Sequence, residues 1–266
     1  MNNLNTIDAS LFTQPDLVSE ILSYLDGEAG YVIVKKLNLP INDIELSIAE
    51  FIRFSKQIGE PKPHDNSEIV WHIKHRPSTT SKIKTYSEHN DEAPFHTDAQ
   101  YRPNPENYFA LLTLKKAICG GGISSIITAS SIKKILAADP LGAEITKLFT
   151  ETNLPFAVPS VFSLSKLGIE NEVTFATIFY DTNKIRYRFD TLMKGLEYYP
   201  DTISKNQKKL ILHFDNILNL SNEAIEFTLD NGDLLFINNE TVLHKRTSFK
   251  DINRHLLRIR LDRPQE

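Results

Sequence analysis

The chain has a single cysteine, no long apolar run and little excess charge, and each shortage excludes a class of protein. Cys119 is the only cysteine among 266 residues, so no disulfide can form within the chain, which fits a reducing compartment. No run approaches the ~18 apolar residues that a membrane-spanning helix needs. The net charge of −4 gives no basic footprint for nucleic acid. The segment Met1–Asp8 lacks the basic and apolar regions of a secretion signal, so we expect a cytoplasmic protein.

The spacing of apolar residues predicts a mainly β chain with flanking helices. Helices are expected at residues 14–27, 42–57, 129–150 (with a break at Pro140) and 203–219. The apolar stripe of the second helix consists of Ile44, Ile48, Phe51, Ile52 and Phe54. Strands are expected at residues 30–35, 68–74, 108–115, 123–128, 173–180, 184–189, 224–229, 233–238 and 256–261. Many short strands with helical buttresses favour a single β sandwich or barrel.

One short segment, Glu92–Tyr101, carries two side chains with metal-binding chemistry, His96 and Asp98. On an extended chain the side chains at i and i+2 point the same way, so an imidazole and a carboxylate can meet at one ion. A third ligand is needed. The best candidate is His244, which we place near the end of the apolar strand that follows Gly232. Two histidines and one carboxylate are the ligand set of non-haem Fe(II) oxygenases.

Two alternatives to this iron site stay open on residue chemistry alone. The other histidines are rival ligands: His64, His72, His75, His89, His213 and His255. Of these, His213 lies on a predicted helix, and His75 and His89 flank a polar loop at residues 76–93. A closed zinc site is disfavoured by the single cysteine, but a catalytic zinc could use the same two histidines and carboxylate.

The last predicted strand carries three arginines, Arg254, Arg258 and Arg260, on one face. Either that face meets water on an edge strand with scattered ion pairs, or it meets an anion. A guanidinium group can hold a carboxylate through two parallel hydrogen bonds. An iron site that uses a dicarboxylate cosubstrate needs such a group a short distance from the metal.

Four segments together resemble the Fe(II)/2-oxoglutarate-dependent dioxygenases of the TauD/TfdA, clavaminate-synthase-like group. They are Ala93–Tyr101, Gly120–Ile126, Gly232–Phe249 and Arg254–Arg258, in the order of that family. The resemblance implies a double-stranded β-helix, the cupin-like jelly roll. We therefore expect one domain over residues 1–266, with a helical buttress at about 1–60 and a core at about 60–264 that holds an insertion at about 129–220.

The resemblance implies that the catalytic centre is one Fe(II) ion held by His96, Asp98 and His244. With 2-oxoglutarate and O2 as cosubstrates, the reaction would release succinate and CO2. Halogenating relatives lack the carboxylate at the position of Asp98, so its presence makes hydroxylation of an unactivated C–H bond the expected outcome.

The resemblance also implies how the cosubstrate is held. Arg254 would anchor the distal carboxylate of 2-oxoglutarate, assisted by the hydroxyl of Ser124. Arg258 would reach either the cosubstrate or an acidic group of the substrate.

Three segments are candidates for the substrate pocket: Trp71–His75, Tyr86–His89 and Arg186–Asp190. Glu88 and Asp190 could bind an ammonium group while Arg258 binds a carboxylate, which suits a small molecule such as an amino acid or a derivative. The alternative is that Glu88 and Asp190 form ion pairs with Lys84 and Arg188 on a solvent-exposed loop. The expected substrate-binding residues are Glu88, Asp190, Arg188, Trp71 and Tyr101.

Two functions from different classes are compatible with the sequence. The first is an iron- and 2-oxoglutarate-dependent hydroxylase. The second is a non-catalytic metal-binding jelly roll that acts as a sensor or a partner-binding module. An anchor for a cosubstrate favours the enzyme, and within that class desaturation, cyclisation and epimerisation share the same iron site.

If His96 is a ligand of the metal, the His96→Ala protein should fail to convert 2-oxoglutarate to succinate, because a ligand of the reactive ion is lost. Succinate formation by the anaerobically loaded and then aerated protein is the measurement. Normal turnover by His96→Ala would show that the three ligands are wrongly assigned.

Overall fold

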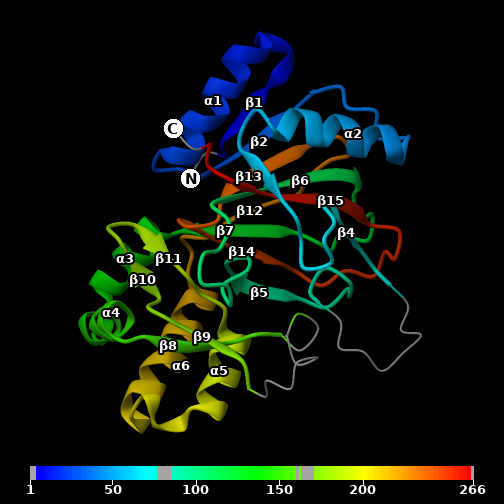
Figure 1. Ribbon diagram of the computed structural model, residues 1–266. Helices are drawn as coiled ribbons and strands as arrows, with labels where there is room; N and C mark the ends of the chain where they lie inside the picture. The colour runs from blue at the N-terminus through cyan, green and yellow to red at the C-terminus, as the bar shows by residue number, and fades with distance from the viewer. Residues whose placement is uncertain (1–3, 77–84, 160–161, 163–170, 265–266) are drawn as a thin grey trace.

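Two β-sheets form the centre of the molecule, and helices cover both of their outer sides (Figure 1). The structure is a computed structural model, and it describes residues 4–76, 85–159, 162 and 171–264. The larger sheet has the strand order β1-β2-β13-β6-β15-β3, with β4 also paired to β15. Its strands are β1 (Thr6–Asp8), β2 (Tyr31–Lys35), β3 (Glu60–Lys62), β4 (Trp71–Lys74), β6 (Tyr108–Lys115), β13 (Leu234–Asn238) and β15 (His255–Asp262).

The smaller sheet has the order β12-β7-β14-β5. Its strands are β5 (Ala93–His96), β7 (Ser124–Thr128), β12 (Ile225–Phe227) and β14 (Val242–Arg246). The chain between β7 and β12 adds two strand pairs, β8 (Leu154–Ala157) with β9 (Val173–Ala176) and β10 (Phe179–Tyr180) with β11 (Lys184–Ile185). The α-helices are α1 (Gln14–Asp26), α2 (Ile44–Ser55), α3 (Ala129–Ala138), α4 (Gly142–Glu151), α5 (Phe189–Tyr198) and α6 (Lys205–Leu220).

Alternation along the strands divides the apolar residues among three layers. In β13, Leu234 and Phe236 face α1 and α2, while Leu235 and Ile237 face the space between the sheets. Successive side chains of a strand point to opposite faces, so a strand buried on both sides reads as a continuous apolar run. A third layer packs the outer side of the smaller sheet, including Leu243 of β14, against α3 to α6. The space between the sheets is the layer that holds the polar site described below.

Side chains at the helix starts supply the bonds that the first turns lack. The Asp43 carboxylate accepts a hydrogen bond from the Leu46 amide of α2 at 3.0 Å. At the start of α6, Ser204 and Gln207 form a reciprocal capping box, with bonds of 2.9 and 3.2 Å. Such caps stabilise a helix end by about 1 kcal/mol each.

The predicted fold class is confirmed: the protein is mainly β with flanking helices, in a jelly-roll arrangement. The helices expected at the chain start, on both sides of Pro140 and after residue 203 are present as α1, α2, α3, α4 and α6. Residues 77–84 of the predicted polar loop lie outside the described residues. No helix in the described parts of the chain is long and apolar enough to cross a membrane.

The predictions for residues 173–192 are partly wrong. The apolar run 173–180 is not one strand, because its two ends pair with different partners: β9 with β8, and β10 with β11. The hairpin after Tyr180 is confirmed, but its second strand covers only Lys184–Ile185. Phe189 begins the helix α5, which the alternating Arg-Tyr-Arg-Phe pattern concealed. Contact of Leu192 and Leu196 with the helical layer outweighs this local strand signal.

One smaller expectation also fails, and one of the two alternatives for the arginine-bearing strand is excluded. Ile44 does not belong to the buried stripe of α2; it is 46% exposed, whereas Ser47 is fully buried and donates to the Pro40 carbonyl oxygen at 2.8 Å. β15 is not a solvated edge strand, since β6 pairs with one of its sides and β3 and β4 with the other. Its three arginines therefore face the interior.

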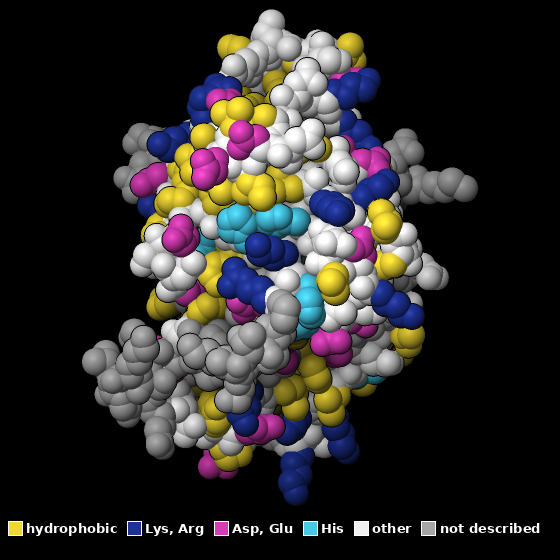
Figure 2. All heavy atoms as spheres, turned by 90° about the vertical axis from the view of Figure 1, so that its right-hand side faces the viewer, with side chains coloured by type: hydrophobic (Ala, Val, Ile, Leu, Met, Phe, Trp, Pro, Cys, Tyr) yellow, Lys and Arg dark blue, Asp and Glu magenta, His cyan; other side chains and the backbone are white. Residues whose placement is uncertain are grey.

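The side of the molecule on which β4 and the start of β15 lie carries histidine side chains next to lysines and arginines (Figure 2). On these two strands, His72 Nδ1 and His255 Nε2 lie 2.9 Å apart. This pair belongs to the sheet face opposite the interior arginines, because both residues alternate with inward-facing neighbours.

The layered core predicts unequal costs for two leucine truncations. Leu257 in β15 is fully buried, so Leu257→Ala should lower the free energy of unfolding by about 2–5 kcal/mol. Leu220 is 72% exposed at the end of α6, so Leu220→Ala should change it by less than about 0.5 kcal/mol. Urea unfolding followed by circular dichroism measures both. Equal midpoints for the two variants would contradict this assignment of the core.

Candidate active site

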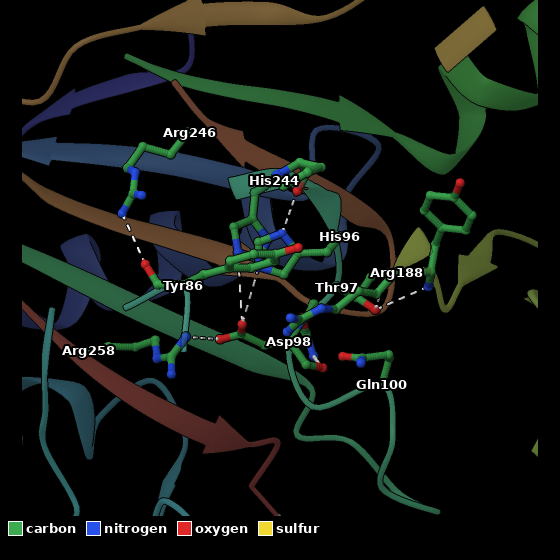
Figure 3. A network of polar contacts seen from close by, with 12 residues as sticks. Tyr86, His96, Thr97, Asp98, Gln100, Arg188, His244, Arg246 and Arg258 are labelled. Atoms are coloured by element: carbon green, nitrogen blue, oxygen red, sulfur yellow. Dashed lines mark hydrogen bonds and ion pairs between the residues drawn. The ribbon is translucent and has the colours of Figure 1, made fainter. Parts of the chain in front are cut away.

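The three expected metal ligands meet in the space between the sheets. His96 at the end of β5 and His244 in β14 are directly opposite each other in the antiparallel register. Ligand atoms of His96, Asp98 and His244 all lie within 4.8 Å of one another, and Figure 3 shows the three side chains pointing toward a common point. His244 lies in the middle of β14, a strand that was not predicted, and not at the end of the preceding strand.

Hydrogen bonding presents one nitrogen of His96 to this point. Its Nδ1–H donates to the Pro94 carbonyl oxygen at 2.7 Å, which leaves Nε2 as the free lone pair. The Asp98 Oδ1 atom lies 3.8 Å from His96 Nε2 and 3.9 Å from His244 Nε2. One carboxylate oxygen and two imidazole nitrogens therefore face each other with room for an ion between them.

The charge states of the three groups suit a bound cation. Burial, and then the charge of Arg188, lowers the pKa of His96 to about 4, and burial likewise holds the pKa of His244 well below its usual value. Burial alone would raise the pKa of Asp98, but the adjacent Arg258 holds it below the ordinary range. Neutral imidazoles and an ionised carboxylate are the forms in which these residues bind metals. The donor set thus fits Fe(II).

Backbone contacts with the residues just before α5 hold the segment that carries His96 and Asp98 in place. The Thr97 amide donates to the Tyr187 carbonyl oxygen at 2.8 Å, and His96 forms an isolated β-bridge with Arg188. After Asp98 the backbone turns sharply, because Ala99 has a φ of 52°. A left-handed alanine costs on the order of 1–3 kcal/mol and persists only where its surroundings fix it.

Arg254 is the one arginine of the interior face for which the described residues offer no acceptor. Its guanidinium lies over the Phe249 ring at 5.1 Å, and its Nη1 is buried without a partner. Burial, and then the nearby charge of Arg246, lowers the pKa of Arg254 to about 9. Gly122 packs against it so closely that a Cβ there would lie 3.2 Å from the Arg254 Nε. A buried cation without a counter-ion is costly, and a bound anion would relieve that cost.

The other two arginines of this face already have partners. Arg258 Nη1 donates to the Asp98 Oδ2 atom at 2.7 Å, so it holds the carboxylate oxygen that points away from the histidines (Figure 3). Arg260 Nη1 donates to Asp65 at 3.2 Å and lies 3.8 Å from Glu106. Neither contact is predicted by the sequence: Arg258 is expected to reach the cosubstrate or the substrate, and Arg260 has no expected partner.

The structure separates the five expected substrate residues into two groups. Trp71, Tyr101 and Arg188 line the cavity that contains the triad, together with Ser124, Arg254 and Arg258. Glu88 does not line it: its carboxylate accepts from Arg76 at 3.0 Å and from Thr85. Asp190 binds the Arg188 guanidinium at 2.7 and 2.9 Å and borders a neighbouring groove. The pairing of Asp190 with Arg188 is therefore present, but the pair is not on a solvated loop, because Asp190 lies in the first turn of α5 and Arg188 lines the cavity. Lys84 lies outside the described residues.

None of the rival histidines joins the triad. In the described parts of the chain, His96, Asp98 and His244 are the only group of three with ligand atoms near enough for one ion. His213 binds Asp139 at 3.0 Å, consistent with a place on the helix surface. His75 and His89 are not among the residues that line the cavity, but His64 is, and its Nε2 contacts the Arg258 carbonyl oxygen at 3.2 Å.

The sequence placed Tyr86 in a candidate pocket segment, which the cavity lining confirms, but gave it no role, and it did not single out Arg246. The Tyr86 ring lies 5.5 Å from the His96 ring and 4.1 Å from the Arg188 guanidinium, and its hydroxyl donates to Asp190 at 2.9 Å. Arg246 donates to the backbone oxygens of Tyr86, His89 and Asp91 and so holds the segment that precedes the triad. The one available signal was position, since Tyr86 precedes the ligands and Arg246 follows His244 by one strand period.

The comparisons with known proteins agree with this geometry. The family model for the taurine catabolism dioxygenase TauD, TfdA family matches residues 7–260. An asparagine oxygenase in complex with Fe(II), 2S,3S-3-hydroxyasparagine and succinate has a TM-score of 0.71 at 15% identity, covering 93% of this chain and 79% of that chain. No curated protein sequence gives a significant match.

A second group of similar structures comes from the non-heme iron oxygenase OrfP. Its complex with Fe and alpha-ketoglutaric acid has a TM-score of 0.66 at 14% identity, covering 94% of this chain and 80% of that chain. Its complex with Fe, succinate and (3S)-hydroxy-L-Arg also has a TM-score of 0.66, at 15% identity over 94% and 81% of the chains. At these identities the structural similarity establishes the fold. Because the family model covers most of the sequence, the chain belongs to the TauD/TfdA family of dioxygenases.

Proposed function

We propose that the protein is an Fe(II)- and 2-oxoglutarate-dependent oxygenase that hydroxylates an unactivated C–H bond of a small, amino-acid-like molecule. One observation carries the proposal: a His-Asp-His cluster with the charge states of metal ligands shares a cavity with an arginine that has no counter-ion among the described residues. A non-catalytic metal-binding module would have no need for that second feature.

The residues of the cavity would divide the work as follows. His96, Asp98 and His244 would hold the ion, and Arg254 would bind the distal carboxylate of 2-oxoglutarate with the hydroxyl of Ser124 beside it. Bound iron, with 2-oxoglutarate and O2, supplies the oxidising power for hydroxylation and releases succinate and CO2. Arg258 would keep Asp98 oriented, because its bond to Oδ2 leaves Oδ1 for the metal.

The surroundings of Arg188 support a role in substrate binding. Arg188 lines the cavity beside the triad, and two of its nitrogens are fixed by Asp190 while its plane rests on Tyr86. A guanidinium group fixed in this way is pre-organised to bind a carboxylate with its remaining donors. Trp71 and Tyr101 provide aromatic walls on which the rest of a small substrate can pack.

An amino acid is the substrate class that these features favour. Solved structures similar in fold include oxygenases in complex with hydroxyasparagine and hydroxyarginine, and Arg188 offers a site for a substrate carboxylate. Glu88 and Asp190 were expected to bind an ammonium group. Each instead forms an ion pair with an arginine, so neither carboxylate is free for that role.

A substrate panel tests this proposal. The protein with Fe(II), 2-oxoglutarate and O2 should form succinate slowly alone and faster with at least one free L-amino acid, which should gain one oxygen atom. Succinate is followed enzymatically and the product by mass spectrometry, with taurine and other small acids as comparison substrates. If only a non-amino acid accelerates turnover, the substrate class is wrong; if no 2-oxoglutarate is ever consumed, the proposed function is wrong.

Removing the guanidinium of Arg254 should weaken cosubstrate binding without destabilising the free protein. Arg254→Met deletes a buried cation that has no counter-ion among the described residues, so the metal-free protein should melt at the same temperature or higher. It should lose the rise in melting temperature that 2-oxoglutarate with Fe(II) gives the original protein under anaerobic conditions.

The matched control is Arg260→Met on the same face of β15. Arg260 is paired with Asp65 and Glu106, which Arg102 also contacts, so its removal deletes part of a buried ion network and should cost about 1.5–3 kcal/mol. Differential scanning calorimetry compares the two variants. Equal destabilisation by both, or a retained 2-oxoglutarate shift in Arg254→Met, would remove Arg254 from its proposed role.

A further inference from the structure

Two adjacent buried asparagines lie where the chain crosses from the larger sheet to the smaller one: Asn238 is the last residue of β13, and Asn239 begins the connection to β14. Their side chains bind different parts of the molecule. Asn238 Nδ2 donates to the Leu25 carbonyl oxygen of α1 at 2.9 Å, and its Oδ1 accepts from the Glu240 amide at 3.0 Å. Neither bond involves the iron site.

The side chain of Asn239 instead forms hydrogen bonds with the backbone of Asp98, a proposed metal ligand. Its Oδ1 accepts a hydrogen bond from the Asp98 amide at 2.7 Å, and its Nδ2 donates to the Asp98 carbonyl oxygen at 3.1 Å. The same Nδ2 donates to the Glu106 carbonyl oxygen at 3.0 Å, and the Asn239 amide donates to the Asn107 carbonyl oxygen at 2.8 Å. A carboxamide is the side chain that can both donate and accept across one residue in this way.

Asp98 needs this support because it lies beyond the end of its strand. β5 ends at His96, so no ladder of backbone hydrogen bonds holds the Asp98 amide and carbonyl. The next residue, Ala99, is in the left-handed region, where alanine remains only if its neighbours fix it. Asn239 supplies the two backbone bonds that a continued strand would have provided.

We propose that Asn239 is a positioning residue that sets the Asp98 carboxylate relative to His244 and so determines the affinity of the site for Fe(II). This inference rests on the proposed function, since it takes Asp98 as a metal ligand. The connection that bears Asn239 leads directly into β14, which carries His244. One short segment thus supplies one ligand and fixes the backbone of another, although Asp98 is distant in the sequence.

Metal affinity measured without turnover tests the proposal. Asn239→Ala should bind Fe(II) roughly 10–100-fold more weakly than the original protein, the range seen when groups that orient metal ligands are removed. The affinity is measured anaerobically by competition with a chromophoric chelator. The visible charge-transfer band formed with 2-oxoglutarate reports whether the bound metal is still chelated. Product formed per succinate should also fall, because a misplaced ion reacts without oxidising the substrate.

Asn238→Ala is the matched control, because it removes the same side chain from the adjacent buried position. Both variants lose buried hydrogen bonds, so both should unfold at lower urea concentration. Only Asn239→Ala should lose metal affinity, and a merely structural role for Asn239 predicts equal affinity in the two variants, which would overturn the proposal. If Asn239→Ala does not fold, Asn239→Ser gives the same comparison with a smaller packing defect.

The original protein separates this proposal from the proposed function. If it binds Fe(II) and 2-oxoglutarate and Asn239→Ala binds them equally well, the positioning role fails while the function stands. If the original protein binds neither, Asp98 is not part of an iron site and both fail together.

Discussion

The register between β5 and β14 is the constraint on which the site depends. It places His96 and His244 directly across from each other, with ring centroids 4.1 Å apart. A shift of one residue would turn the side chain of His244 to the other face of the sheet, into the apolar layer beside α3 to α6. In the actual register, Val242 and His244 face the space between the sheets and Leu243 faces the helices, so packing of the neighbours fixes the histidine as well.

Electrostatic balance inside the jelly roll limits what the cavity can bind. One face of β15 and the residue just before it bring three arginines into the interior, and two of them are neutralised by carboxylates of the protein. The third, Arg254, has no counter-ion in the part of the chain that the structure describes, and so is left for a bound anion. Arg188 is likewise matched by Asp190. Once the metal offsets Asp98, the cavity wall carries excess positive charge, which favours carboxylate-bearing ligands.

The sequence predicted which three side chains come together better than it predicted the strands that carry them. His96 and Asp98 could be paired from their spacing, and His244 followed from the need for a third ligand. β14 was missed because Thr-Val-Leu-His-Lys-Arg is short and follows a polar turn, so no clear alternation marks it. Asn239 and Arg258 could not be assigned from the chain alone, because their partner Asp98 lies far away in the sequence and no local pattern encodes such a contact. Glu88 was assigned from charge, which does not reveal that a nearby arginine already occupies it.

The central claim is that His96, Asp98 and His244 bind one ferrous ion and that Arg254 binds a carboxylate of 2-oxoglutarate beside it. Anomalous X-ray diffraction at the iron edge, from crystals prepared anaerobically with Fe(II) and 2-oxoglutarate, tests it most directly. The account predicts a single strong iron peak between the three side chains, with a carboxylate of 2-oxoglutarate on Arg254. An iron peak elsewhere, for example at the His72–His255 pair, with none at the triad, would contradict it.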